Sequence, residues 1–186
     1  MGDISSNGEF NKQELATIDS ISRLVDDVSD EDKYLTFEVG EKTFGINIEP
    51  VKEIIEYERL TRIPMTPRYI RGVVNLRGNV VPIIDLANRL DLSGRDISKR
   101  TCLIILQLTV EDETMDIGIL VDSVSEVLDL PAADIEPAPS FGVEVRSDFI
   151  EGMGKIQGHF VTILDIAKVL SIQELSQFSD FIDSVG

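Results

Sequence analysis

The chain of 186 residues carries 34 acidic and 17 basic residues, for a formal net charge of −17, and 42% of its residues are hydrophobic. This content suffices for a buried core in one domain or two small ones. The acidic balance argues against a nucleic-acid partner and an anionic membrane surface, because both need a concentrated basic face.

Two further features indicate where the protein works. A single cysteine, Cys102, excludes an intramolecular disulfide and fits a reducing compartment. The first residues lack an apolar signal core, and no run approaches the roughly 18 apolar residues that a membrane helix needs. We therefore expect a cytoplasmic protein with no direct membrane insertion, whose partners are other proteins.

Both ends of the chain differ from its middle. Residues 1–33 hold nine acidic and three basic residues, with apolar side chains only at loose helical spacing. This pattern predicts an acidic flexible tail, mostly disordered, with one marginal helix. Residues 171–186 place apolar side chains on one stripe and predict a C-terminal helix. The stripe consists of Ile172, Leu175, Phe178 and Ile182.

Between these ends, short β-branched runs bounded by turn residues predict an all-β sandwich or barrel. Gly40–Lys42 and Arg77–Gly78 supply two of the turns. The predicted strands are residues 34–39, 43–48, 53–57, 72–76 and 79–84, followed by residues 102–110, 115–121, 125–130, 152–157 and 159–164.

The predicted strands form an internal repeat. "YIRGVVNLRGNVVPIIDLANRL" (69–90) aligns without a gap with "FIEGMGKIQGHFVTILDIAKVL" (149–170), with eight identities in 22 positions at an offset of 80. "FGINIEPVKEIIE" (44–56) aligns with "IGILVDSVSEVLD" (117–129) at an offset of 73. Two copies are too few for a solenoid, so we predict two small five-stranded β-barrels, one from residues 34–98 and one from residues 99–170.

Positions that are identical in both copies indicate what the unit itself requires. Gly78 and Gly158 stand where a tight hairpin turn favours positive φ. Asp85 and Asp165 end a strand before a short helical run, which is typical of an N-cap. The alternative is that these two carboxylates act as the acid and base of a hydrolase or transferase, and it requires that both line one cleft.

Arg77 is a different case, because its counterpart in the second copy is the neutral Gln157. The turn therefore does not need a charge. Residues 59–84 hold five arginines and no acid, a basic island on an acidic protein. We predict that Arg77 serves contact or orientation, and that an ion pair with Glu53 holds its planar guanidinium. The alternative is a solvated surface arginine.

Other catalytic or ligand-binding constellations are not evident. The only histidine, His159, falls in a predicted hairpin turn, so neither a zinc site nor a Cys/His nucleophile can be assembled from the usual ligands. A ligand-binding barrel is a further alternative, and it predicts a large internal cavity.

"FGINIEPVKEIIE", "TPRYIRGVVNLRGNVVPIIDL" and "VDSVSEVL" resemble the CheW family, the coupling proteins of bacterial chemotaxis, over residues 34–174. The resemblance implies two SH3-like barrels with a hydrophobic groove between them, no enzymatic activity and no cofactor. It implies an adaptor, recruited to membrane receptor arrays, that couples the cytoplasmic signalling tip of methyl-accepting chemoreceptors to the regulatory domain of the histidine kinase CheA. A non-flagellar chemosensory pathway, for pili or another output, is an alternative setting.

The resemblance also implies which positions contact the partners. The receptor-binding and coupling positions are Val51, Glu53, Arg71, Gly72, Arg77, Val121 and Val124. The kinase-binding positions, at the hydrophobic end of a barrel, are Ile150, Gly152 and Leu164.

Overall fold

The computed structural model describes residues 18, 21, 32–110, 112–138 and 145–171. Its regular elements are β1 (Lys33–Val39), β2 (Lys42–Asn47), β3 (Val51–Glu56), β4 (Ile70–Leu76), β5 (Asn79–Asp85), α2 (Leu86–Arg89), β6 (Cys102–Val110), β7 (Glu113–Val121), β8 (Ser123–Asp129), η1 (Ala132–Asp134), β9 (Ile135–Glu136), η2 (Ser147–Phe149), β10 (Ile150–Ile156), β11 (His159–Leu164) and α3 (Ile166–Leu170). Each of the ten predicted strands is present. The predicted all-β class is therefore confirmed.

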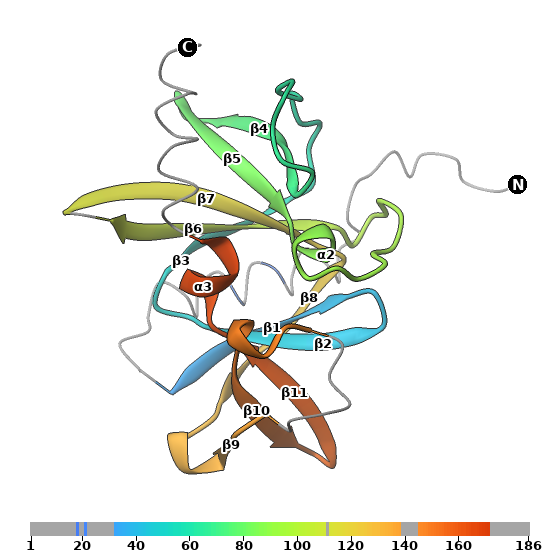
Figure 1. Cartoon of the computed structure of the whole chain (residues 1–186), viewed down its shortest axis with the longest axis vertical. Helices are drawn as coiled ribbons and strands as arrows, with labels where there is room; N and C mark the ends of the chain where they lie inside the picture. The colour runs from blue at the N-terminus through green and yellow to red at the C-terminus, as the bar shows by residue number, and fades with distance from the viewer. Residues whose placement is uncertain (1–17, 19–20, 22–31, 111, 139–144, 172–186) are drawn as a thin grey trace, which may run out of the picture.

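The strands form two sheets (Figure 1). Sheet A has the order β8-β1-β2-β11-β10-β9, and sheet B has the order β3-β6-β7-β5-β4. Neighbouring strands are antiparallel except for two parallel pairs, β2 with β11 and β5 with β7. Each sheet curves around a small apolar cluster of its own, and a larger cluster lies against both sheets.

The two sheets are related by the repeat, with an exchange of strands. β1 to β5 correspond in order to β6, β7, β8, β10 and β11 in the second copy. With this correspondence, sheet B and the first five strands of sheet A have the same order. Sheet B takes three strands from the first copy and two from the second, whereas sheet A takes two from the first and four from the second, β9 included.

This exchange changes the predicted domain division. Residues 34–98 and 99–170 were expected to form one barrel each, but each stretch supplies strands to both sheets. The alternation of apolar residues identifies a strand and its buried face, but it carries no direct information about the neighbouring strand. The boundary between the copies is therefore not a boundary between the sheets.

Packing between the parallel strands explains why a glycine and an isoleucine are identical in the two copies. Gly45 in β2 lies beside Ile163 in β11, and Gly118 in β7 lies beside Ile83 in β5. A Cβ atom on Gly45 would lie 2.9 Å from the Cδ1 of Ile163, and one on Gly118 would overlap the Cδ1 of Ile83. Glycine from one copy thus makes room for isoleucine from the other, and close packing fixes both residue types.

The short helices begin as predicted. Asp85 caps α2 by accepting a hydrogen bond from the backbone N–H of Asn88 at 3.2 Å. Asp165 caps α3 in the same way, through the N–H of Lys168 at 3.3 Å. Both aspartates satisfy backbone donors that a helix start would otherwise leave unpaired.

Part of the predicted N-terminal tail packs on the core. Ile18 and Ile21 are helical, and Ile21 is 4% exposed within the large cluster. The other residues before Asp32 lie outside the described residues, as does the predicted C-terminal helix after Ser171. In the described part of the chain, no helix is both long and apolar enough to cross a membrane.

Candidate partner-binding surfaces

An ion pair holds Arg77 at the β4–β5 turn. Arg77 adopts φ of 50°, and the following Gly78 adopts φ of 87°. From this turn the Nη2 of Arg77 donates to the Oε1 of Glu53 on β3. The Arg77 side chain is 70% exposed and that of Glu53 is 24% exposed. The predicted pair is therefore confirmed, and it presents a guanidinium that is oriented but still accessible.

The charge of Arg77 does not vary over the physiological pH range. The hydrogen bond to Glu53, followed by the charge of the same carboxylate, raises the pKa of the Arg77 guanidinium above its already high ordinary value. An arginine does not lose its proton in proteins. Arg77 therefore acts as a fixed positive charge on the surface.

The other arginines of the basic island divide into two groups. Arg71 donates to the buried carboxylate of Asp85 at 3.1 Å, and its side chain is 36% exposed. Arg59, Arg62 and Arg68 are exposed on the loop between β3 and β4, and among the described residues they form no ion pair. Arg71 therefore supports the fold, whereas the loop arginines are available to a partner.

The predicted contact positions also differ in exposure. Glu53, Arg71, Val124 and Ile150 are half-buried, and Arg77 is exposed. The remaining positions are buried in the fold and present no surface to a partner, so they shape the neighbouring surface from within. These are Val51, Gly72, Val121, Gly152 and Leu164.

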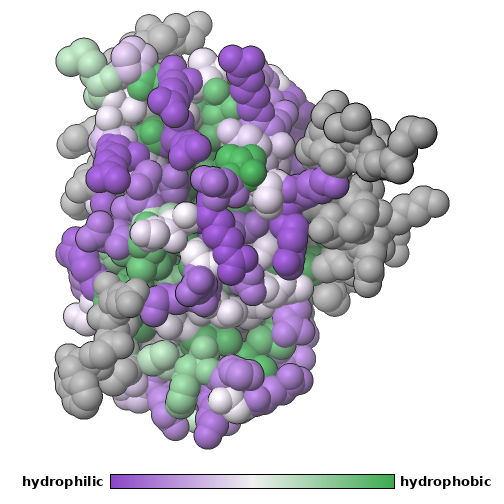
Figure 2. All heavy atoms as spheres, turned by 90° about the vertical axis from the view of Figure 1, so that its right-hand side faces the viewer, coloured by the Kyte–Doolittle hydropathy of each residue, from purple (hydrophilic) through white to green (hydrophobic). Residues whose placement is uncertain are grey.

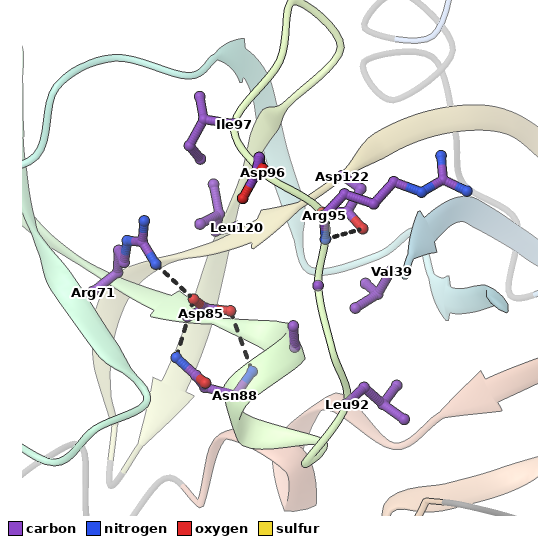
Figure 3. A pocket seen from close by; sticks show the side chains of 12 residues that line it. Val39, Arg71, Asp85, Asn88, Leu92, Arg95, Asp96, Ile97, Leu120 and Asp122 are labelled. Carbon is purple, nitrogen blue, oxygen red and sulfur yellow. Dashed lines mark hydrogen bonds and ion pairs between the residues drawn. The ribbon is translucent and has the colours of Figure 1, made fainter. Parts of the chain in front are cut away.

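A cavity of about 330 Å³ lies where segment 91–97 crosses the junction of the sheets (Figure 3). The carboxylate of Asp122 joins this segment to the β1–β2 turn, because it accepts from the backbone N–H of Gly40 at 2.5 Å and of Arg95 at 3.3 Å. Neither Val121 nor Val124, the predicted groove residues, lines this cavity.

The same cavity bears on the alternative of paired carboxylates. Asp85 lines it but Asp165 does not, and Asp85 is bound by Arg71 and Asn88 (Figure 3). The two aspartates cap separate helices rather than meeting in this cavity. Among the described residues, no group of three or more His, Cys, Asp or Glu side chains is arranged to hold a metal ion.

The sequence did not indicate an exposed aromatic residue, Phe160, in the β10–β11 hairpin, opposite to the hairpin that carries Arg77. Phe160, at the start of β11, is 55% exposed, and the partly buried Ile135 and Ile156 lie at the cluster enclosed by this sheet. Figure 2 shows hydrophobic surface with hydrophilic surface around it at the end that carries β10 and β11. Its counterpart in the repeat, Val80, is also exposed, at 44%.

Fold and surface together define a duplicated β scaffold with an exposed, ion-paired arginine at one end and an exposed phenylalanine at the other. The family model of the CheW-like domain matches residues 33–174. The chain belongs to this family, and it is a chemotaxis adaptor.

Curated relatives and a solved structure agree with this assignment. The chain is 36% identical over 162 residues to a chemotaxis protein CheW from Klebsiella aerogenes, covering 87% of this chain and 95% of the relative. It is 35% identical over 147 residues to a chemotaxis protein CheW from Bacillus subtilis, covering 78% and 90%. The crystal structure of the scaffolding protein TtCheW from Thermoanaerobacter tengcongensis superposes with a TM-score of 0.65 at 31% identity, covering 75% of this chain and 87% of that one.

Proposed function

We propose that this protein couples methyl-accepting chemoreceptors to the histidine kinase CheA by protein contacts alone, without catalysis, within cytoplasmic assemblies at the membrane receptors. The observation that carries the proposal is the separation of two chemically different surfaces. The Arg77–Glu53 pair is on sheet B, at the β4–β5 turn, and Phe160 is on sheet A, at the start of β11. The β4–β5 and β10–β11 hairpins lie at opposite ends of the molecule (Figure 1). An adaptor needs two such surfaces so that its partners do not compete.

The receptor surface is the basic one. Arg77 keeps N–H donors that Glu53 does not use, and a planar guanidinium binds a carboxylate through paired hydrogen bonds. The three loop arginines add positive charge beside an otherwise acidic molecule. We infer that this surface receives an acidic stretch of the receptor's signalling helix, since charge complementarity favours register and partner choice.

The kinase surface is the apolar one. Of the predicted kinase positions, Ile150 is half-buried, and Gly152 and Leu164 are buried. Phe160 is better placed for direct contact, because more than half of its side chain is exposed. Aromatic anchors that become buried on binding contribute strongly to interfaces. We infer that Phe160 is such an anchor for the regulatory domain of CheA.

The repeat supplies matched controls for a test. Arg77→Glu reverses the charge at one hairpin turn, and Gln157→Glu adds the same charge at the equivalent turn of the other hairpin. We expect Arg77→Glu to weaken binding of a receptor signalling fragment at least about tenfold, with binding of the CheA regulatory domain unchanged.

Phe160→Ser, with Val80→Ser as its control, should show the opposite selectivity. Isothermal titration calorimetry with each isolated partner measures both constants. Equal losses for both partners with either variant, or no loss with either, would contradict the proposal. Circular dichroism should show the same folded spectrum for all four variants.

A further inference from the structure

One side chain joins the two sheets at several points. Arg89, the last residue of α2, donates its Nε–H to the backbone carbonyl of Val169 in α3 at 2.5 Å. Its guanidinium carbon lies 4.7 Å from the centre of the Tyr69 ring and 5.2 Å from the centre of the Phe149 ring. Arg89 and Tyr69 flank strands of sheet B, whereas Val169 and Phe149 flank strands of sheet A.

The repeat shows that this contact lies on the axis relating the two copies. Val169 is the counterpart of Arg89 at the offset of 80, and Phe149 is the counterpart of Tyr69. Arg89 therefore contacts its own counterpart, as is expected for residues close to the axis of a two-fold relation between the copies. Figure 1 shows α2 and α3 in the middle of the molecule, between the β4–β5 and β10–β11 hairpins.

The chemistry of the contact is directional. The carbonyl of Val169 is in the last turn of α3, where carbonyls lack helical partners, and a charged donor satisfies it. The two rings hold the guanidinium by cation–π attraction. The apolar cluster shared by the sheets resists their separation, but hydrophobic attraction is non-directional. Arg89 supplies contacts that define an orientation.

We propose that Arg89 is a positioning residue that fixes the angle between the sheets and thereby transmits the state of a partner on one sheet to the partner on the other. The coupling role rests on the proposed function, whereas the fixed angle does not. An adaptor transmits a signal only if binding at one surface biases the geometry presented at the other. Loosening the junction should therefore abolish transmission while leaving each contact intact.

Substitutions of Arg89 and of the neighbouring Arg146 provide the test variants and their control. Arg89→Met keeps an unbranched side chain but removes the charge and the Nε–H donor, and Arg89→Lys keeps the charge. Arg146→Met is the matched control. Arg146 also lies over the Phe149 ring, at 4.7 Å, but its ion pair is with Asp148 in the same segment, so it does not bridge the sheets.

The first measurement needs no partner. Nitroxide labels at Asn79→Cys and His159→Cys, in a Cys102→Ala background, report the distance between the equivalent hairpin turns by electron–electron double resonance. We expect a narrow distribution that Arg89→Met broadens at least about twofold, Arg89→Lys broadens less, and Arg146→Met leaves unchanged. A distribution that stays narrow in Arg89→Met would overturn the proposal.

The second measurement uses full-length protein with receptor fragments and CheA. We expect Arg89→Met to bind each isolated partner within about twofold of the parent affinity, yet to lower receptor-dependent kinase activity at least about fivefold. Broadening without loss of kinase control would also overturn the proposal. Failure of the parent protein to bind the partners would instead refute the proposed function, and the distance measurement would still decide the role of Arg89 in the sheet angle.

Discussion

The residue that precedes the hairpin glycine differs between the two copies, and the comparison shows which of its properties the turn requires. Arg77 and Gln157 adopt nearly the same backbone conformation, with φ of 50° and 48°. Both turns therefore form with either a charged or a neutral side chain. The Arg77–Glu53 pair is largely exposed, and such pairs add little to stability. Its value lies in the orientation that it gives to a surface charge.

A second pair of counterparts shows the opposite arrangement of charge. Arg71 in the first copy binds Asp85, but its counterpart Glu151 faces the like charge of Asp165. Burial, followed by the charge of Asp165, raises the pKa of the Glu151 carboxyl above its ordinary 4.5. The folded state thus favours the protonated form. The protonated Glu151 carboxyl therefore contributes to stability in full at pH values below its pKa in the unfolded chain. This contribution is lost as the pH rises through its pKa in the folded protein.

Glu151→Gln should remove this dependence. We expect the variant and the parent to be equally stable at low pH, where both side chains are neutral. Above the raised pKa the variant should be more stable by less than about 1 kcal/mol, because the Glu151 carboxyl is only partly shielded from water. Urea unfolding across this range measures the difference, with Glu113→Gln, an exposed strand glutamate, as the control. A difference that is constant with pH would contradict the assignment.

At the scale of elements, the parallel pairs β2–β11 and β5–β7 depend on a glycine facing an isoleucine. Gly118 has less room than Gly45, and the facing Ile83 is fully buried, so a shift of its side chain would disturb a close-packed core. The steric requirement is therefore one of packing rather than of backbone conformation.

Gly118→Ala should destabilise the protein by about 1–3 kcal/mol through overpacking, and Gly45→Ala should cost less. Adding Ile83→Val removes the opposing Cδ1 atom, so the double variant should lose less than the sum of the single losses by at least about 0.5 kcal/mol. Denaturant unfolding of the four proteins measures this coupling. Additive losses would show that the two side chains do not compete for space.

The same elements show how far the sequence can predict the fold. Alternation and turn residues predicted each long strand, but not β9, whose two residues are too few for a pattern. They did not predict which strands pair. The identities Gly45/Gly118 and Ile83/Ile163 do result from the pairing, because each glycine lies beside an isoleucine of the other copy. Aligning the two copies shows that these residues are identical in both. It does not show that the glycine of one copy lies beside the isoleucine of the other copy.

The candidate site was predictable where charge stood out. Arg77 was noticed because its counterpart is neutral, and Glu53 followed as the nearest carboxylate. Phe160 was missed because a phenylalanine in a β-branched run is typical of a core, and only the three-dimensional structure shows that this position lies outside it. Val121 and Leu164 were assigned as contact positions from the family resemblance, which does not specify how far each side chain is buried, and both are buried in the structure.

At the scale of the whole molecule, the exchange of strands makes the copies interdependent. Neither sheet can form from one copy, because each contains at least two strands from each copy. An isolated copy would leave strand edges unpaired and its half of the shared cluster exposed.

Fragments 1–98 and 99–186 should therefore be unfolded alone and fold when mixed. Circular dichroism and amide NMR spectra of each fragment, of the mixture and of the intact chain test this. Cooperative unfolding of either fragment by itself would contradict the observed topology and support two independent barrels.

The central claim is that one scaffold holds two partners at once on separate surfaces. Sedimentation velocity of the protein with a receptor signalling fragment and the CheA regulatory domain tests it most directly. We predict a ternary species in which saturation with either partner leaves the affinity for the other at least as high. Displacement of one partner by the other would contradict the account.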